Sequence, residues 1–165
     1  MDARPEFAAI LDVLSQHGVS FIVVGGVAAV LSGAPVNTLD TDVLVERSPE
    51  NLERLLAALV ELDAIYRDPA HRRIEPTVER LKGLGQQQLI TRFGPLDVLG
   101  TIGHQRTYDE LRSRTVEMPL RGRIVRVLEL GAVIESKEEA NRPKDLAVLP
   151  VLRETLAARR RRGER

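Results

Sequence analysis

The chain has 165 residues, with 24 basic and 24 acidic side chains and no cysteine. This length suits one domain over residues 1–165, which we expect to hold a sheet-containing core (1–127) and a C-terminal helical segment (128–165). The lack of cysteine excludes disulfides, thiolate metal sites and cysteine nucleophiles, and the balanced charge argues neither for nor against a nucleic-acid partner. No apolar run approaches a membrane span and no apolar signal segment opens the chain, so we expect a soluble, cytoplasmic protein with no membrane partner.

The N-terminal segment predicts a packing helix over residues 5–17. Phe7, Ile10 and Leu14 recur at helical spacing, and Gly18 follows as a typical residue after a helix end. Nothing in this helix demands a function.

The stretch from Phe21 to Glu46 predicts a strand, a glycine turn, a short helix, a loop and a second strand. An apolar run ends abruptly at Gly25-Gly26, and a second run follows Asp42. Because Gly25 and Gly26 have no side chains, a ligand can approach the backbone closely, and the N–H groups of the following helix start suit a phosphate.

Asp40 and Asp42 lie two residues apart at the entrance of the second predicted strand. At this spacing both carboxylates project from one face of the strand, whereas Thr41 projects from the other. Adjacent carboxylates repel each other unless a cation lies between them, and hard divalent ions held by shared carboxylates are typical of phosphoryl-transfer sites. Taken alone, such a pair is more often two solvated turn acids.

The next segments differ in how clearly they predict structure. Ser48-Pro49 is a helix-start signal, and leucines recur at helical spacing from there to residue 62, which predicts a second amphipathic helix. Residues 64–88 are punctuated by proline and glycine, so we expect loops and one short helix there.

A pair of strands is predicted over residues 88–93 and 96–99, joined tightly at Gly94-Pro95. Asp97 then lies early in the second of these strands. Alternation along the strand places Asp97 and Leu99 on the face opposite to Leu96 and Val98.

The C-terminal third predicts a short helix, a hairpin and two longer helices. Thr107 and Glu110 have capping-box spacing, and residues 116–127 read as a hairpin around Arg121-Gly122-Arg123. Helices are expected over 128–140 and 143–160, the second kinked near Pro150.

Lys137 occupies an unusual position on the first of these two helices. Leu130, Ile134 and Lys137 stand on one apolar stripe, where a charge is costly unless an anion meets it. Lys137 either snorkels to solvent at the helix end or meets an anionic ligand.

Several of these features, in this order, resemble the DNA polymerase beta-like nucleotidyltransferase superfamily. They are the Gly25-Gly26 turn, the Asp40-Thr41-Asp42 strand entrance and the later strand residue Asp97. Residues 135–145 are also similar to the Lys-then-Arg-x-Lys-Asp helix pair of small bacterial members, including abortive-infection toxin relatives. The likeness covers most of the chain. It implies an α/β (α+β) nucleotidyltransferase fold, with a short mixed sheet flanked by helices and with C-terminal helices.

The resemblance also implies a reaction and its residues. A nucleoside monophosphate would pass from an NTP such as ATP to a hydroxyl of RNA, protein or a small molecule, and pyrophosphate would leave. The catalytic residues and ligands of Mg²⁺ or Mn²⁺ would be Asp40, Asp42 and Asp97. The nucleotide and its phosphates would be bound by Gly25, Gly26, Thr38, Lys137 and Arg142.

Two positions depart from the toxin-like relatives. Those relatives commonly carry arginine where this chain has Val36, and aspartate where it has Val148. Both departures weaken the transfer of toxin function but leave the three aspartates untouched.

Other readings remain open. The fold could serve a non-catalytic nucleotide-binding or antitoxin-like partner of a toxin–antitoxin pair, or an RNA-binding module that uses the arginines at 159–162. A dinucleotide-binding turn is disfavoured, because the third glycine of its fingerprint is missing.

The remaining basic residues give no clear signal. His17, His71 and His104 lack the spacing of metal ligands. The alternating arginines of the predicted hairpin, at 121, 123 and 126, are more often a solvated face than a nucleic-acid site.

Overall fold

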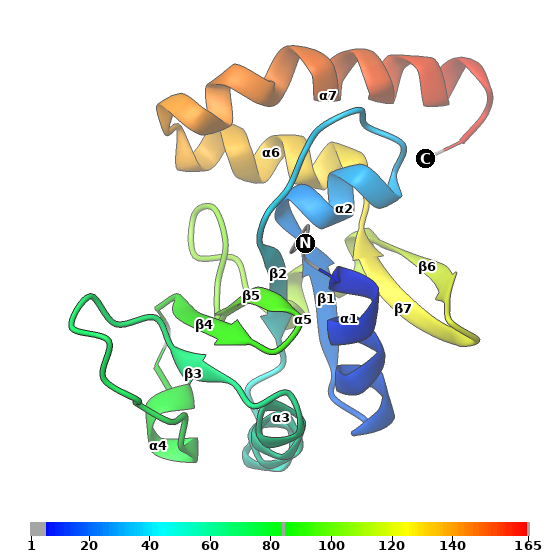
Figure 1. The fold of residues 1–165 in the computed structure, drawn as a ribbon. Helices are drawn as coiled ribbons and strands as arrows, with labels where there is room; N and C mark the ends of the chain where they lie inside the picture. The colour runs from blue at the N-terminus through cyan, green and yellow to red at the C-terminus, as the bar shows by residue number, and fades with distance from the viewer. Residues whose placement is uncertain (1–5, 84, 165) are drawn as a thin grey trace.

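The computed structural model describes residues 6–83 and 85–164 (Figure 1). Its helices are α1 (Phe7–Gln16), α2 (Gly25–Leu31), α3 (Pro49–Glu61), α4 (Val78–Leu81), α5 (Tyr108–Leu111), α6 (Leu130–Ala140) and α7 (Pro143–Arg161), with a 3-10 turn, η1, at Arg112–Arg114. Its strands are β1 (Phe21–Val24), β2 (Thr41–Val45), β3 (Ile65–Tyr66), β4 (Gln87–Thr91), β5 (Gly94–Leu99), β6 (Thr115–Leu120) and β7 (Arg123–Leu128).

These strands form one mixed sheet in the order β3-β4-β5-β2-β1-β7-β6. At its centre, β1 is antiparallel to β2 and parallel to β7, and β2 is parallel to β5. Antiparallel pairs, β3 with β4, β4 with β5 and β6 with β7, extend the sheet on both sides. The expected mixed sheet with flanking and C-terminal helices is therefore confirmed.

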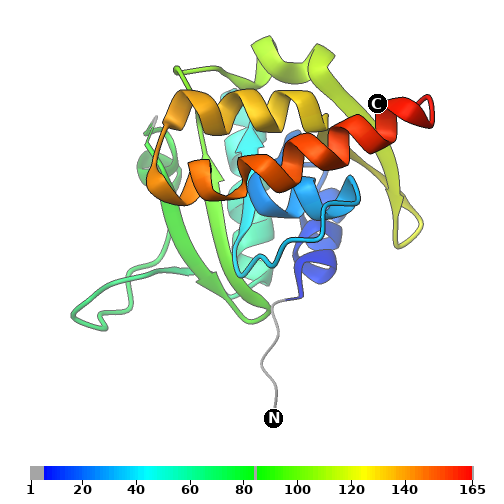
Figure 2. The same ribbon diagram turned by 90° about the horizontal axis from the view of Figure 1, so that it is seen from above.

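The helices lie in two groups. α1 contacts α3 and β7, whereas α2 contacts β1, β2 and α6, and α6 packs along α7. Figure 1 shows α7, α6 and α2 one below another at the top of the molecule, and Figure 2 shows α7 passing obliquely in front of α2, with α6 beside α7. The two C-terminal helices thus lie near the end of β1 that leads into α2.

The core is built from apolar side chains of the sheet and of both helix groups. Ile10 of α1, Leu55 of α3, Ile22 of β1 and Leu44 of β2 are completely buried. Burial of such side chains contributes about 1.5–3 kcal/mol each to folding. Within the described ranges, no helix combines the length and the apolar character needed to cross a membrane.

Several predicted boundaries are confirmed by local hydrogen bonds. The Ser48 hydroxyl accepts a hydrogen bond from the N–H of Asn51 at the start of α3, and Thr107 and Glu110 form the predicted capping box at α5. Arg121 and Gly122, both with positive φ, make the turn between β6 and β7. Such residues suit the two-residue turns whose twist matches that of a hairpin.

Other boundaries differ from the prediction. The turn between β4 and β5 falls at Arg92-Phe93 rather than at Gly94-Pro95, because the Thr91 hydroxyl accepts from the Phe93 N–H at 3.0 Å and donates to the Gly94 carbonyl at 2.8 Å. The short strand β3 was not predicted. Helix α7 spans Pro143–Arg161 with Pro150 inside it, close to the predicted range of 143–160, and the predicted kink at Pro150 stays a prediction. Pro5, the predicted start of the first helix, lies outside the described residues.

Candidate active site

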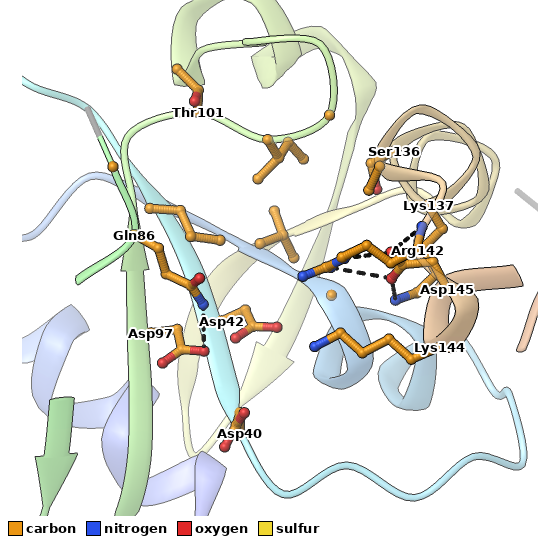
Figure 3. Close-up of a pocket in the computed structure, with 17 residues that line it drawn as sticks. Asp40, Asp42, Gln86, Asp97, Thr101, Ser136, Lys137, Arg142, Lys144 and Asp145 are labelled. Atoms are coloured by element: carbon orange, nitrogen blue, oxygen red, sulfur yellow. Dashed lines mark hydrogen bonds and ion pairs between the residues drawn. The ribbon is translucent and has the colours of Figure 1, made fainter. Parts of the chain in front are cut away.

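Three carboxylates meet where β2 and β5 lie side by side. Asp42 is the register partner of Asp97, and Asp40 lies just before β2 begins. Partners in adjacent strands point to the same face of a sheet, so the carboxyl groups of Asp42 and Asp97 lie close enough for Asp97 to raise the pKa of Asp42. Figure 3 shows Asp40 grouped with them. The three predicted aspartates thus lie together, and we call them the acidic wall.

Burial and mutual repulsion raise the pKa values of two carboxyl groups in the acidic wall. Burial raises the pKa of Asp42 to about 7, together with the neighbouring carboxyl groups of Asp97 and Asp40, although the charge of Lys137 acts in the opposite direction. Burial also raises the pKa of Asp97, against the lowering effect of Arg67. A bound cation would reverse both shifts, because an opposite charge favours the ionised carboxylate.

The glycine turn is shaped by side chains of the protein itself. Gly25 has a φ of 64°, and a Cβ there would lie 2.2 Å from Oδ2 of Asp42. A Cβ at Gly26 would lie 2.6 Å from Oγ1 of Thr38. The Thr38 hydroxyl in turn donates to the Asp40 carbonyl at 2.9 Å, which shapes the approach to β2. Both glycines therefore allow close approach of the acidic strand.

Asp97 is held by two residues that the sequence did not single out. The guanidinium of Arg67 binds Oδ1 of Asp97, and its Nη1 lies 4.0 Å from Oδ1 of Asp40. The amide of Gln86 donates to Oδ2 of Asp97 at 2.9 Å. Both oxygens of Asp97 therefore have partners in the structure.

The acidic wall fits a divalent cation by its chemistry. Carboxylate oxygens are the ligands that Mg²⁺ and Mn²⁺ prefer, and Asp40 and Asp97 lie close enough to Asp42 for their charges to raise its pKa. Residues 6–83 and 85–164 nevertheless contain no group of three or more His, Cys, Asp or Glu side chains arranged to hold a metal ion. At Asp97, the positive charge is supplied by Arg67.

Facing the acidic wall are Lys137 of α6, Arg142 between the two C-terminal helices, and Lys144 of α7, which we call the basic wall. Lys137 Nζ lies 3.6 Å from Oδ1 of Asp145, and Arg142 Nε lies 2.6 Å from its Oδ2. Figure 3 shows Lys144 extending toward Asp42 and Asp40. The proposed anionic partner of Lys137 thus includes a residue of the chain itself.

Asp145 is the buried anchor of the basic wall. It is 2% exposed, and its carboxylate also accepts the backbone N–H of Arg142, which completes a capping box at the start of α7. Burial alone would raise the pKa of Asp145, but the hydrogen bond from Arg142 and the charges of Arg142 and Lys137 lower it below its ordinary value. One carboxylate therefore fixes two cations of the site.

Two cavities share lining residues of both walls, and Figure 3 shows the residues that line the first. The first, of about 430 Å³, has polar residues such as Gln86, Thr101 and Ser136 in its lining, together with Asp97. The second, of about 310 Å³, includes Gly26 and Thr38. The lining residues common to both are Asp40, Asp42, Lys137, Arg142, Lys144 and Asp145. All eight predicted site residues line one cavity or both.

The second cavity is partly apolar. Val36, Leu39, Val148 and Leu152 line it. Val36 and Val148 are the two positions that depart from the toxin-like relatives, and the fold brings them to one cavity. Valines there cannot hold a phosphate by charge, as an arginine could.

Sequence reasoning missed Arg67, Gln86 and Lys144. Arg67 and Gln86 lie in the segment without periodicity, so no local pattern marks them, and a sheet pairing across β4 brings Arg67 to Asp97. Lys144 lies within the quoted Arg-x-Lys-Asp run, which was the available signal.

Most of the other singled-out residues make structural contacts. Nε2 of His17 lies 2.9 Å from Glu61, and Arg123 pairs with Asp12. Arg159 donates to the carbonyl of Ser32 at 2.9 Å, so part of the arginine tail packs against the protein.

No protein-family model matches the chain, and no curated protein matches it. Solved structures do. The lincosamide antibiotic adenylyltransferase LnuA, in its lincomycin-bound form, is 13% identical, with a TM-score of 0.60 over 89% of this chain and 94% of that chain. TM1012 of Thermotoga maritima, provisionally named a nucleotidyltransferase, is 18% identical, with a TM-score of 0.56 over 92% and 90%.

A third similar structure is ANT(2")-Ia in complex with adenylyl-2"-tobramycin. It is 16% identical and has a TM-score of 0.55 over 92% of this chain and 87% of that chain. None of these three structures is named as a toxin, so the toxin-type subfamily stays a prediction. The agreement in fold extends over nearly the whole of each chain, and this protein has the fold of these nucleotidyltransferase structures.

Proposed function

We propose that the protein is a metal-dependent nucleotidyltransferase that transfers a nucleoside monophosphate from an NTP to a hydroxyl of a small molecule. The observation that carries this proposal is the pair of walls that share two cavities. Three carboxylates on β2 and β5 face three cations around α6 and α7 across the same space. This arrangement suits a polyanionic nucleotide with a cation between it and the carboxylates.

Each wall has its own part in the reaction. A divalent cation, when bound to Asp40 and Asp42, would neutralise the charge of the phosphates. The backbone at Gly25 and Gly26, the Thr38 hydroxyl and the basic wall would orient the triphosphate. Such orientation, rather than covalent catalysis, supplies most of the rate in phosphoryl transfer.

The chemical step needs a base near the acceptor. The acceptor oxygen would attack the α-phosphorus, its proton would pass to Asp97, and the bond to the β-phosphate would break to release pyrophosphate. Asp97 suits this role by position, because it lines the first cavity beside Asp42, where an acceptor could lie next to the nucleotide.

The nature of the acceptor is supported by size and by the similar structures. The cavities, of about 430 and 310 Å³, are in the range of small-molecule sites. LnuA is named with lincomycin, and ANT(2")-Ia with an adenylylated tobramycin. The internal contact of Arg159 makes an RNA acceptor bound by the arginine tail the weaker choice.

The deciding experiment incubates the protein with each NTP, labelled at the α-phosphate, Mg²⁺ or Mn²⁺, and a cell lysate. With wild type, label should appear in a new small-molecule product that is separated from the NTP and its hydrolysis products. With Asp42→Asn, this product should be absent. Label in RNA or protein would change the acceptor. No label in any fraction, with NTP binding retained, would favour the non-catalytic nucleotide-binding partner.

A further inference from the structure

Arg67 is placed by the sheet rather than by its own segment. It follows β3, and its backbone N–H donates to the carbonyl of Gln88 at 3.0 Å, which extends the pairing with β4 by one residue. Its Nε donates to the carbonyl of Leu89 at 3.2 Å. The side chain is therefore held across β4, with its end directed toward β5.

At that position the guanidinium meets two of the three carboxylates of the acidic wall. Nη2 binds Asp97, whose side chain is 5% exposed, and Nη1 lies 4.0 Å from Asp40. The Arg67 side chain itself remains 33% exposed. A guanidinium with access to solvent can leave such a site without being buried elsewhere.

Arg67 occupies the Asp97 carboxylate that a divalent cation in the acidic wall would need. Arg67 and Gln86 use both oxygens of Asp97, and the described residues offer no set of three ligands arranged for a metal ion. Two cations cannot share this carboxylate closely without repulsion.

We propose that Arg67 is the internal counter-ion of the acidic wall, bound to Asp97 and near Asp40 in the metal-free protein, and that it leaves Asp97 when a divalent cation binds. This rests on the proposed function only in the requirement for a divalent cation. Arg67 is thus a positioning residue. It keeps the carboxylates together before the site is loaded, and it sets the affinity for the metal.

The test measures Mn²⁺ binding by calorimetry in metal-free, full-length wild type and in Arg67→Met. Methionine keeps an apolar stem and removes the charge, so Mn²⁺ should bind about tenfold more tightly or better, because a competing charge within ion-pair distance is gone. A matched control is Arg92→Met. Arg92 stacks on Phe93, with 4.4 Å between its Cζ and the ring centroid, and its loss should leave Mn²⁺ affinity unchanged.

A second readout is stability toward urea, which requires no measurement of metal affinity. In EDTA, Arg67→Met should unfold at a lower urea concentration than wild type, and saturating Mn²⁺ should remove this difference. A purely structural role for Arg67 would lower stability equally with and without Mn²⁺, which overturns the proposal.

The outcomes also separate this inference from nucleotidyl transfer. If Arg67→Met binds Mn²⁺ equally well or more weakly, and wild type transfers NMP to an acceptor, the role of Arg67 is overturned and the proposed function stays intact. Tighter Mn²⁺ binding in Arg67→Met, with no transfer to any acceptor by wild type, supports the role of Arg67 and contradicts the proposed function.

Discussion

The acidic wall and the basic wall face each other across the same cavities, but their charges are balanced in different ways. The acidic wall depends on partners far apart in the sequence, since Arg67 holds Asp97. Its balance is incomplete, because burial and the neighbouring carboxyl groups raise the pKa of Asp42 to about 7. The basic wall depends on a local anchor, because Asp145 holds Arg142, three residues earlier, and Lys137 on the preceding helix.

This difference suggests that the acidic wall serves ligand binding first, whereas the basic wall serves both ligand binding and folding. Charges without full compensation cost stability and persist where a ligand uses them. The acidic wall therefore has the character of a site that awaits a cation, whereas the basic wall contributes to folding even without a ligand. Substitution of Asp42 should therefore lower activity more than stability, whereas substitution of the anchor Asp145 should lower stability.

The largest expected effect is on activity, at Asp42. Asp42→Asn should lower transfer by about 100-fold or more, because it removes a charge needed around the transferring phosphate. Its urea unfolding midpoint should stay unchanged or rise, since one crowded negative charge is removed. Asp109→Asn, an exposed acid on α5, is the control for charge and should change neither property. A large loss of stability in Asp42→Asn would contradict the contrast between the walls.

Gly25 tests how closely the acidic wall approaches the backbone. Gly25→Ala should lower the free energy of unfolding by about 2–3 kcal/mol, since it combines a positive φ with a contact to Asp42. Gly33 also has a positive φ, but nothing lies within 4 Å of an added Cβ. Gly33→Ala should therefore cost only about 1 kcal/mol. Equal costs in urea unfolding would remove the contact from the explanation.

Asp145 tests the local anchor of the basic wall. Asp145→Asn should lower the free energy of unfolding by about 2 kcal/mol, because a buried carboxylate that caps α7 and pairs with two cations loses its charge. The loss should not be larger, because the Arg142 side chain is largely exposed and solvent screens its attraction to Asp145. Chemical denaturation measures this change, and a variant as stable as wild type would show that the anchor has no structural weight.

Lys137 sharpens the comparison from the side of ligand binding. Lys137→Met should weaken NTP binding about tenfold, because one phosphate-facing charge is lost. Thermal stability should change little, since Arg142 still compensates Asp145 and the stem remains packed. Calorimetry with NTP and Mg²⁺ checks the first expectation, and a thermal melt checks the second. Unchanged NTP affinity would assign Lys137 to the anchor alone.

The smallest expected effect is a pH dependence of the basic wall. Because the pKa of folded Asp145 is lowered from 3.8, its stabilising effect is complete above that value and is lost as pH falls through the folded pKa. Asparagine resembles the protonated carboxyl group. The difference in unfolding free energy between wild type and Asp145→Asn should therefore persist from about pH 7 to pH 5 and shrink below about pH 4. A difference that is constant down to about pH 2 would exclude an ionic origin.

The two walls also differ in how far the sequence predicts them. The basic wall and the glycine turn lie in contiguous segments, so short patterns locate Gly25, Lys137 and Arg142. The meeting of Asp42 with Asp97 followed from the family resemblance, not from spacing, because strand register depends on long-range pairing.

What the sequence could not predict arose from competing local interactions and from distant pairing. Gly94-Pro95 is a typical turn pair, yet hydrogen bonds of the Thr91 hydroxyl close the turn two residues earlier. Arg67 lies among loops with no periodic pattern, and a sheet pairing outside the range of any motif brings it to Asp97. Asp145 lies in the Arg-x-Lys-Asp run, but its burial and its ion pairs with Lys137 and Arg142 depend on the fold.

The strand order has a consequence for how the protein meets other chains. β3 and β6 are the edges of the sheet, and an open edge invites strand addition by a second chain. β3 spans only two residues, and β6 carries Pro119, which has no N–H to donate. Both edges are therefore poor templates for edge-to-edge growth, and we expect any association with another protein to use side chains rather than a shared ladder of backbone hydrogen bonds.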